Sequence, residues 1–157
     1  MNIFPFRRYK EDFLVTILRF AVGSVFLWFG LDKWVHPGAW QAWFDLWIWP
    51  ITLLGPSLVM FSIGSLELAM GFFFLSGRRP RVIAAAAAIY LILICLFAGV
   101  SDATVRDAGL IGGCLALFVS ANQRSKQPVS QNWIAALTTT YILYLFAVGV
   151  LFLRHGP

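Results

Sequence analysis

The stretch Ser65-Leu66-Glu67-Leu68-Ala69-Met70-Gly71 decides how this chain folds. It lies in an apolar run from residue 51 to residue 75, in which Glu67 is the one charged residue. An ionised carboxylate in hydrocarbon is costly unless a partner or water meets it, so such a residue indicates a functional site by default. Gly64, Glu67 and Gly71 share one helical face. We therefore expect other helices to pack closely on this face and one of them to supply a partner for the acid.

The composition is that of a polytopic membrane protein. Of the 157 residues, 60% are hydrophobic and 12% are charged. A soluble domain carries roughly 25% charged residues, which excludes an ordinary soluble fold. The formal net charge of +5 comes from short basic clusters between apolar runs. These clusters are typical of cytoplasmic loops and not of a nucleic-acid surface. We expect a bacterial or archaeal cytoplasmic (inner) membrane location, the lipid bilayer as a partner, and no nucleic acid.

Five apolar runs predict an all-α membrane protein with a four-helix transmembrane bundle and a fifth, C-terminal transmembrane helix. The expected helices span residues 13–34, 51–77, 82–100, 103–121 and 133–153. The corresponding regions are a cytoplasmic lead-in (1–12), the four-helix membrane domain (13–121), a polar linker (122–132) and the added helix (133–157). The basic clusters place the N-terminus inside, and five crossings then place the C-terminus outside.

Six of the seven tryptophans fall between Trp28 and Trp49. The segment from residue 34 to residue 50 has prolines near both ends, and its aromatic residues repeat at helical spacing. This pattern predicts a short Trp-rich helix that lies flat at the outer membrane interface, as part of an aromatic belt.

Charged and small residues share the same helical stripes in the first and fourth predicted spans. The first stripe holds Thr16, Arg19, Gly23, Phe26, Gly30 and Lys33, and the second holds Asp102, Arg106, Gly109, Gly113, Ala116 and Ser120. Gly109-x-x-x-Gly113 has the spacing of closely packed membrane helices. Because small residues let backbones approach, these stripes predict that Arg19, Glu67 and Arg106 face the bundle interior.

Depth in the membrane then suggests the ion pairs. Arg19 lies roughly 9 Å and Glu67 roughly 15 Å from the inner surface, a difference that an arginine side chain spans. We predict an Arg19–Glu67 pair, which would serve either as a functional site or only as structural support for helix register. A second, wetter cluster is expected near the outer ends, where its members are either site residues or solvated helix ends. It comprises Asp32, Lys33, Asp102, Arg106 and Asp107.

The sequence indicates no metal or haem. Cys95 and Cys114 lie at different expected depths, so we interpret them as small packing residues and not as a disulfide. His36 and His155 are both expected near the outer surface, and two ligands at that position are too few to indicate a metal or a transmembrane haem.

Three segments resemble the DoxX family of small integral membrane proteins (DoxX/DoxD-like). They are LRFAVGSVFLWFGLDKW in the first predicted helix, ELAMGFFFLSGRRPR in the second and RDAGLIGGCLALFVSAN in the fourth. Together they lie within residues 13–121, and the fifth helix departs from the usual four-helix family core. The resemblance implies a membrane bundle that is sometimes a subunit of a thiosulfate:quinone oxidoreductase. The matching polar positions are Arg19, Lys33, Glu67, Arg106 and Asp107.

Two functions follow from this resemblance. The first is a subunit of a quinone-linked redox complex, working with other membrane or redox subunits. Glu67, Arg106 and Asp107 are then the candidate catalytic residues. Lys33 and Arg19 with Trp28, Trp34 and Trp40 are the candidate residues for binding a quinone or a small anion such as thiosulfate. The second function is a non-catalytic anchor or assembly subunit, in which the fifth helix, with Thr138–Thr140 and Tyr141, docks a partner protein or lipid. A small carrier is a weaker third interpretation, because no inverted repeat is visible.

Overall fold

The computed structural model describes residues 5–41, 55–98, 101–125 and 129–155, which form α-helices joined by short connections. The helices are α1 (Pro5–Val35), α2 (Pro37–Gln41), α4 (Pro56–Ser76), α5 (Pro80–Ala98), α6 (Asp102–Gln123) and α7 (Gln131–His155). No β-strand occurs in these ranges, so the predicted all-α class is confirmed.

Local sequence sets the helix boundaries. Helices α1, α2, α4 and α5 each begin at a proline, whose fixed φ and missing N–H suit the first helical position. Helix α4 ends at Gly77, which has a left-handed φ of 67° and donates its N–H to the carbonyls of Phe73 and Phe74. Ser101 caps α6 through a reciprocal capping box with Thr104.

Within the described ranges, three helices are long and apolar enough to cross a membrane: Phe13–Val35, Pro56–Ser76 and Ala103–Gln123. A shorter apolar helix covers Pro80–Leu96. The second predicted span starts later than expected, at Pro56 and not at residue 51, because Gly55 has a φ of 81° that a helix cannot contain. The predicted Trp-rich interfacial helix is seen only as α2, and its remainder lies in residues 42–54, outside the described residues.

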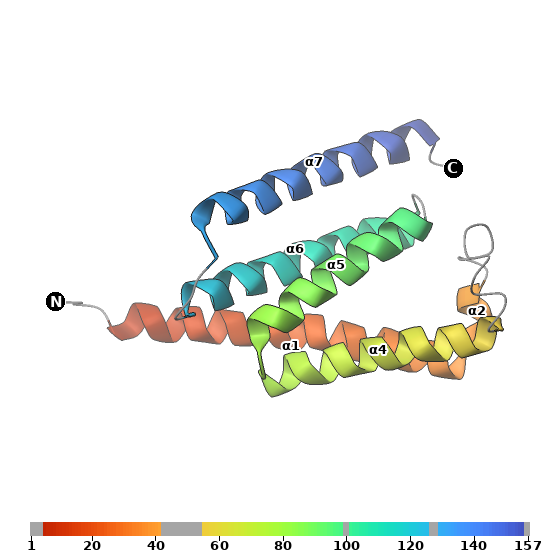
Figure 1. Cartoon of the computed structure of the whole chain (residues 1–157), viewed down its shortest axis with the longest axis horizontal. Coiled ribbons are helices and arrows are strands. Elements are labelled where there is room, and N and C mark those ends of the chain that lie inside the picture. Colours follow the sequence, from red (N-terminus) through yellow and green to blue (C-terminus); the bar gives the residue numbers. More distant parts are fainter. Residues whose placement is uncertain (1–4, 42–54, 99–100, 126–128, 156–157) are drawn as a thin grey trace.

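Helices α1 and α4 run antiparallel and pack along the predicted stripe of small residues (Figure 1). A methyl group added at Gly64 would lie 2.8 Å from the carbonyl oxygen of Gly30, and one added at Gly71 would lie 2.9 Å from that of Gly23. Glycine is therefore required at these crossings, since any side chain would push the backbones apart. The two glycine pairs fix one register of α1 against α4.

Helices α5 and α6 form the second close pair, and the buried core lies between the two pairs. Its members include Phe26, Phe74, Ala84, Ala88, Leu91, Cys95, Ile111, Cys114 and Leu117. The two cysteines are buried free thiols, consistent with their interpretation as packing residues. The predicted close contact at Gly109 is wrong: a methyl group there would meet nothing within 4 Å, whereas one at Gly113 would meet Val22 at 3.1 Å.

Helix α7 lies apart from this core and contacts only α6 among the described helices (Figure 1). The hydroxyl of Tyr141 donates a hydrogen bond to the carbonyl oxygen of Ala108, and the same ring lies against Gly112. Trp133, Ile142, Leu143 and Phe146 are exposed in the single chain. Among the described helices, α7 is therefore joined to the others through α6 alone.

Candidate functional site

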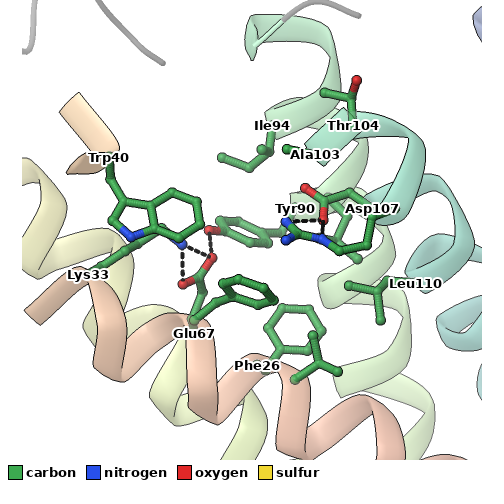
Figure 2. A pocket seen from close by; sticks show the side chains of 14 residues that line it. Phe26, Lys33, Trp40, Glu67, Tyr90, Ile94, Ala103, Thr104, Asp107 and Leu110 are labelled. Atoms are coloured by element: carbon green, nitrogen blue, oxygen red, sulfur yellow. Dashed lines mark hydrogen bonds and ion pairs between the residues drawn. The ribbon is translucent and has the colours of Figure 1, made fainter. Parts of the chain in front are cut away.

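The carboxylate of Glu67 is held by two other helices at the centre of the molecule. The ammonium nitrogen of Lys33 (α1) lies 2.7 Å from Oε2 and 3.0 Å from Oε1, and the hydroxyl of Tyr90 (α5) donates to Oε1 at 2.5 Å. The Lys33 and Glu67 side chains are only 5% and 8% exposed. The acid does face the interior, as its stripe predicted, and Figure 2 shows the three polar groups converging.

The predicted Arg19–Glu67 pair is wrong, and the helix register gives the reason. With Gly23 opposite Gly71 and Gly30 opposite Gly64, Lys33 is level with Phe61 and Arg19 with Leu75. Helical side chains lean toward the N-terminus of their own helix. In this antiparallel pair, Lys33 and Glu67 therefore lean toward each other across about six residues, or ~9 Å. Arg19 and Glu67 lean apart.

Arg19 instead lies at the other end of the bundle, beside the C-terminus of α4. A methyl group added at Gly77 would meet its guanidinium carbon at 3.1 Å. Its Nε is buried without a hydrogen-bond partner among the described residues. Arg19 is thus no part of the site around Glu67.

Trp40 covers the ammonium group of Lys33. The Trp40 ring centre lies 3.8 Å from Nζ, which is a cation–π contact. The indole N–H of Trp40 donates a hydrogen bond to Oδ2 of Asp32 at 2.8 Å. The other oxygen of Asp32 lies 2.9 Å from Nδ1 of His36. Asp32 therefore holds both the turn into α2 and the side chain of Trp40 in α2. Trp40 in turn covers one side of the Lys33–Glu67 ion pair.

A second ion pair lies at the start of α6. Nε and Nη2 of Arg106 donate to Oδ1 of Asp107 at 3.1 and 3.0 Å. Asp107 is buried, whereas the Arg106 side chain is 43% exposed, so the predicted interior position of Arg106 is only partly correct. The guanidinium carbon lies 4.1 Å from the ring centre of Phe29, which also lies 5.8 Å from Nζ of Lys33. The Phe29 ring thus lies within cation–π distance of both cations.

The residues of the Lys33–Glu67 and Arg106–Asp107 ion pairs line one pocket. Its empty space is about 620 Å³, which includes open solvent. Its polar members are Lys33, Glu67, Tyr90, Thr104, Arg106 and Asp107, and its other walls are apolar or aromatic, among them Phe26, Phe29, Trp40, Leu91, Ile94 and Leu110. Two cations face two carboxylates, so the charged groups of the lining carry no formal net charge. Figure 2 shows the ring of Tyr90 lying between Glu67 and Asp107.

The structure therefore brings together most of the residues singled out in the sequence. Lys33, Glu67, Arg106, Asp107 and Trp40 line the pocket. Trp28 and Trp34 do not; they are 68% and 49% exposed. Glu67 lines the same pocket as Lys33, Arg106 and Asp107. The sequence analysis had paired Glu67 with Arg19 and assigned those three residues to a separate cluster.

Tyr90 and Phe29 are the site residues that the sequence analysis did not assign. Tyr90 carries the one hydroxyl group in the apolar run from residue 82 to residue 100. Because a tyrosine hydroxyl usually finds a partner when buried, that isolation was a usable signal for a contact with Glu67. Phe29 is one of fifteen phenylalanines, and nothing in the pattern distinguished it.

Comparison with family models supplies the identification. The model described as DoxX matches residues 14–100, more than half of the chain. The chain belongs to the DoxX family. In this DoxX-family protein the match covers α1 to α5 and ends before α6, so the resemblance of the RDAGL segment lies beyond the matched residues. The comparisons with curated proteins and with solved structures returned no match.

Family membership and the apolar helices make this a small integral membrane protein. Lys33, Glu67 and Tyr90 all lie in the residues that the DoxX model matches, whereas Arg106 and Asp107 follow them. Among the described residues of this DoxX-family chain, no three His, Cys, Asp or Glu side chains gather as a set of metal ligands.

Proposed function

We propose that this DoxX-family protein is a membrane subunit of a quinone-linked redox complex and that its outer pocket holds the quinone head group. The observation that carries the proposal is the pocket around Glu67, in which buried polar groups from three helices meet aromatic and aliphatic walls. Concave, largely apolar sites with a few fixed polar groups are the usual form of small-molecule sites.

The paired charges favour a neutral head group over a small anion. Lys33 is matched by Glu67 and Arg106 by Asp107, so an oxyanion such as thiosulfate would meet a carboxylate beside each cation. A quinone carbonyl requires only a donor. Arg106 has five N–H donors and uses two of them on Asp107, which leaves donors directed elsewhere. The aromatic rings of Phe29 and Trp40 offer flat walls for a planar ligand.

The residues around Glu67 are suited to moving protons. The carboxylate touches an ammonium and a phenol, two donors that are each able to pass a proton through it. A bound quinone would supply two-electron, two-proton chemistry, with the electrons delivered by a partner subunit that oxidises thiosulfate or a related small sulfur compound. In this scheme Lys33, Glu67 and Tyr90 hold or transfer the proton, and Arg106 orients the head group.

A matched pair of tryptophan variants tests the binding part of the proposal. We expect Trp40→Phe and Arg106→Ala to weaken binding of a short-chain benzoquinone to the detergent-solubilised chain, measured by calorimetry. Trp28→Phe is the control, because Trp28 is exposed outside the pocket. Equal affinities for the wild-type chain, Arg106→Ala and Trp40→Phe would contradict the proposal. A loss of quinone reduction in Arg106→Ala within the intact complex would support its redox part.

A second candidate function is a non-catalytic subunit that anchors a partner, and the position of α7 favours it. Among the described helices α7 contacts only α6, and it leaves large apolar side chains exposed. Under either function we infer four spans in one bundle plus α7 as a fifth, with the N-terminus in the cytoplasm, because the basic clusters gather at that end. Cysteine labelling from the two sides of the membrane tests this topology.

A further inference from the structure

A second pocket lies at the opposite end of the bundle from the Glu67 site. It is formed by α1, α4, α5 and α6 and has about 680 Å³ of empty space that includes open solvent. Its polar lining comes from Arg19, Ser120 and Arg124, and its walls from apolar residues including Phe74 and Leu117. Among the residues whose side chains the structure describes, no acidic one lines it. The pocket therefore combines cationic groups with an apolar floor.

Arg19 is the central group of this pocket. Its guanidinium lies against Gly77, at the C-terminus of α4, where the helix dipole favours a cation. That contact explains why an arginine is tolerated at this depth. It leaves the buried Nε donor without a partner among the described residues, and a buried N–H normally has one. An acceptor that enters the pocket would satisfy this donor.

The surrounding charge favours an anionic acceptor. The described segments at this end carry eight Lys or Arg residues: Arg7, Arg8, Lys10, Arg19, Arg78, Arg79, Arg81 and Arg124. The acidic residues in the same segments are Glu11 and Asp12. A basic pocket between transmembrane helices on the cytoplasmic side has the character of a phospholipid head-group site.

We propose that this pocket binds a phosphate group, with Arg19 as its main ligand and Arg124 and Ser120 as further contacts. An anionic phospholipid and free phosphate share this chemistry. The apolar walls beside the arginines leave room for the glycerol and acyl portion of a lipid. The site is separate from the Glu67 pocket and does not depend on the function proposed for it.

The test uses the full chain, delipidated in mild detergent. Apparent affinities are measured by thermal stabilisation and native mass spectrometry with phosphatidylglycerol, phosphatidylcholine or inorganic phosphate at constant ionic strength. The variants are Arg19→Gln, Ala121→Leu, which fills the pocket while keeping every charge, and the control Arg78→Gln. Arg78 is an exposed arginine near the same end and does not line the pocket.

We expect phosphatidylglycerol to bind more tightly than phosphatidylcholine and Arg19→Gln to weaken it by about tenfold or more, the size of one charge-assisted hydrogen bond. Ala121→Leu should weaken it comparably, and Arg78→Gln by no more than about fivefold. Competition by inorganic phosphate, or binding of phosphate alone, would assign the site to the free anion; its absence would assign the site to the lipid.

Three results would overturn the proposal. Equal losses in Arg19→Gln and Arg78→Gln would show diffuse attraction to the basic end and no site. Unchanged affinity in Ala121→Leu would show that the pocket is not occupied, and this variant decides the matter if Arg19→Gln does not fold. Failure of both phosphatidylglycerol and phosphate to bind the wild-type chain would also show that the pocket is not occupied.

Discussion

The ammonium of Lys33 and the carboxylate of Glu67 form a buried ion pair, joined by contacts of 2.7 and 3.0 Å between α1 and α4. Removing one member leaves an unpaired buried charge, which costs far more than losing both. We expect Lys33→Met or Glu67→Gln to lower the free energy of unfolding by about 3–5 kcal/mol, measured by thermal unfolding in detergent.

The double variant Lys33→Met with Glu67→Leu is the control for this prediction. It should recover most of the lost stability, because no charge is then buried alone. A double variant that is less stable than either single variant would show that the pair itself contributes net stability. Asp32→Asn, which alters a more exposed side-chain contact with His36, should cost no more than about 1 kcal/mol.

Tyr90→Phe removes one hydrogen bond to Glu67 and keeps the aromatic ring. Because the acceptor is a buried carboxylate, we expect a loss of about 1.5–3 kcal/mol in the free energy of unfolding. If Tyr90 also passes protons, quinone reduction by the intact complex should fall further than quinone binding does. An equal effect on binding and reduction would restrict Tyr90 to holding Glu67 in place.

The glycine crossing of α1 and α4 gives a third prediction. A methyl group at Gly64 would lie 2.8 Å from the Gly30 carbonyl oxygen and 2.9 Å from the Trp34 ring. Gly64→Ala should therefore destabilise the fold by about 1–3 kcal/mol. The matched control is Gly109→Ala, where the methyl group meets nothing within 4 Å and alanine favours the helix. Similar effects at both positions would contradict the backbone contact.

Gly77 is predicted to be sensitive for a different reason. Its φ of 67° is left-handed, so Gly77→Ala should cost about 1–2 kcal/mol in thermal unfolding experiments. Gly38→Ala is the comparison, since Gly38 has open space around it and is not among the glycines with positive φ. A neutral Gly77→Ala variant would show that α4 does not need a left-handed residue at its end.

Removal of α7 should leave the bundle intact. We expect a chain that ends at Ser125 to keep its helical circular dichroism and most of its unfolding temperature, because α6 is the one described helix that α7 contacts. If α7 docks a partner, this truncation also abolishes co-purification of that partner. Loss of the folded bundle on truncation would contradict the first expectation, and retained co-purification would contradict the docking role.

The sequence by itself determined the class of protein and singled out several residues that line the Glu67 pocket. Apolar runs of membrane length, basic clusters and the stripe of Gly64, Glu67 and Gly71 predicted apolar helices that pack through small residues around an acid. Lys33 and Arg106 were identified with it because charge and small residues recur on the same helical faces, and Asp107 because of its expected depth and the family resemblance. These are local properties that a single helix displays.

Only the tertiary structure decided which residue meets the acid. The glycine pairs set the register of α1 against α4, and in antiparallel helices the lean of each side chain toward its own N-terminus brings Lys33 to Glu67 and turns Arg19 away. Counting depth along each helix ignored this direction. The contribution of Tyr90 likewise depends on how α5 is rotated against α4, which its nearly uniform apolar sequence does not encode.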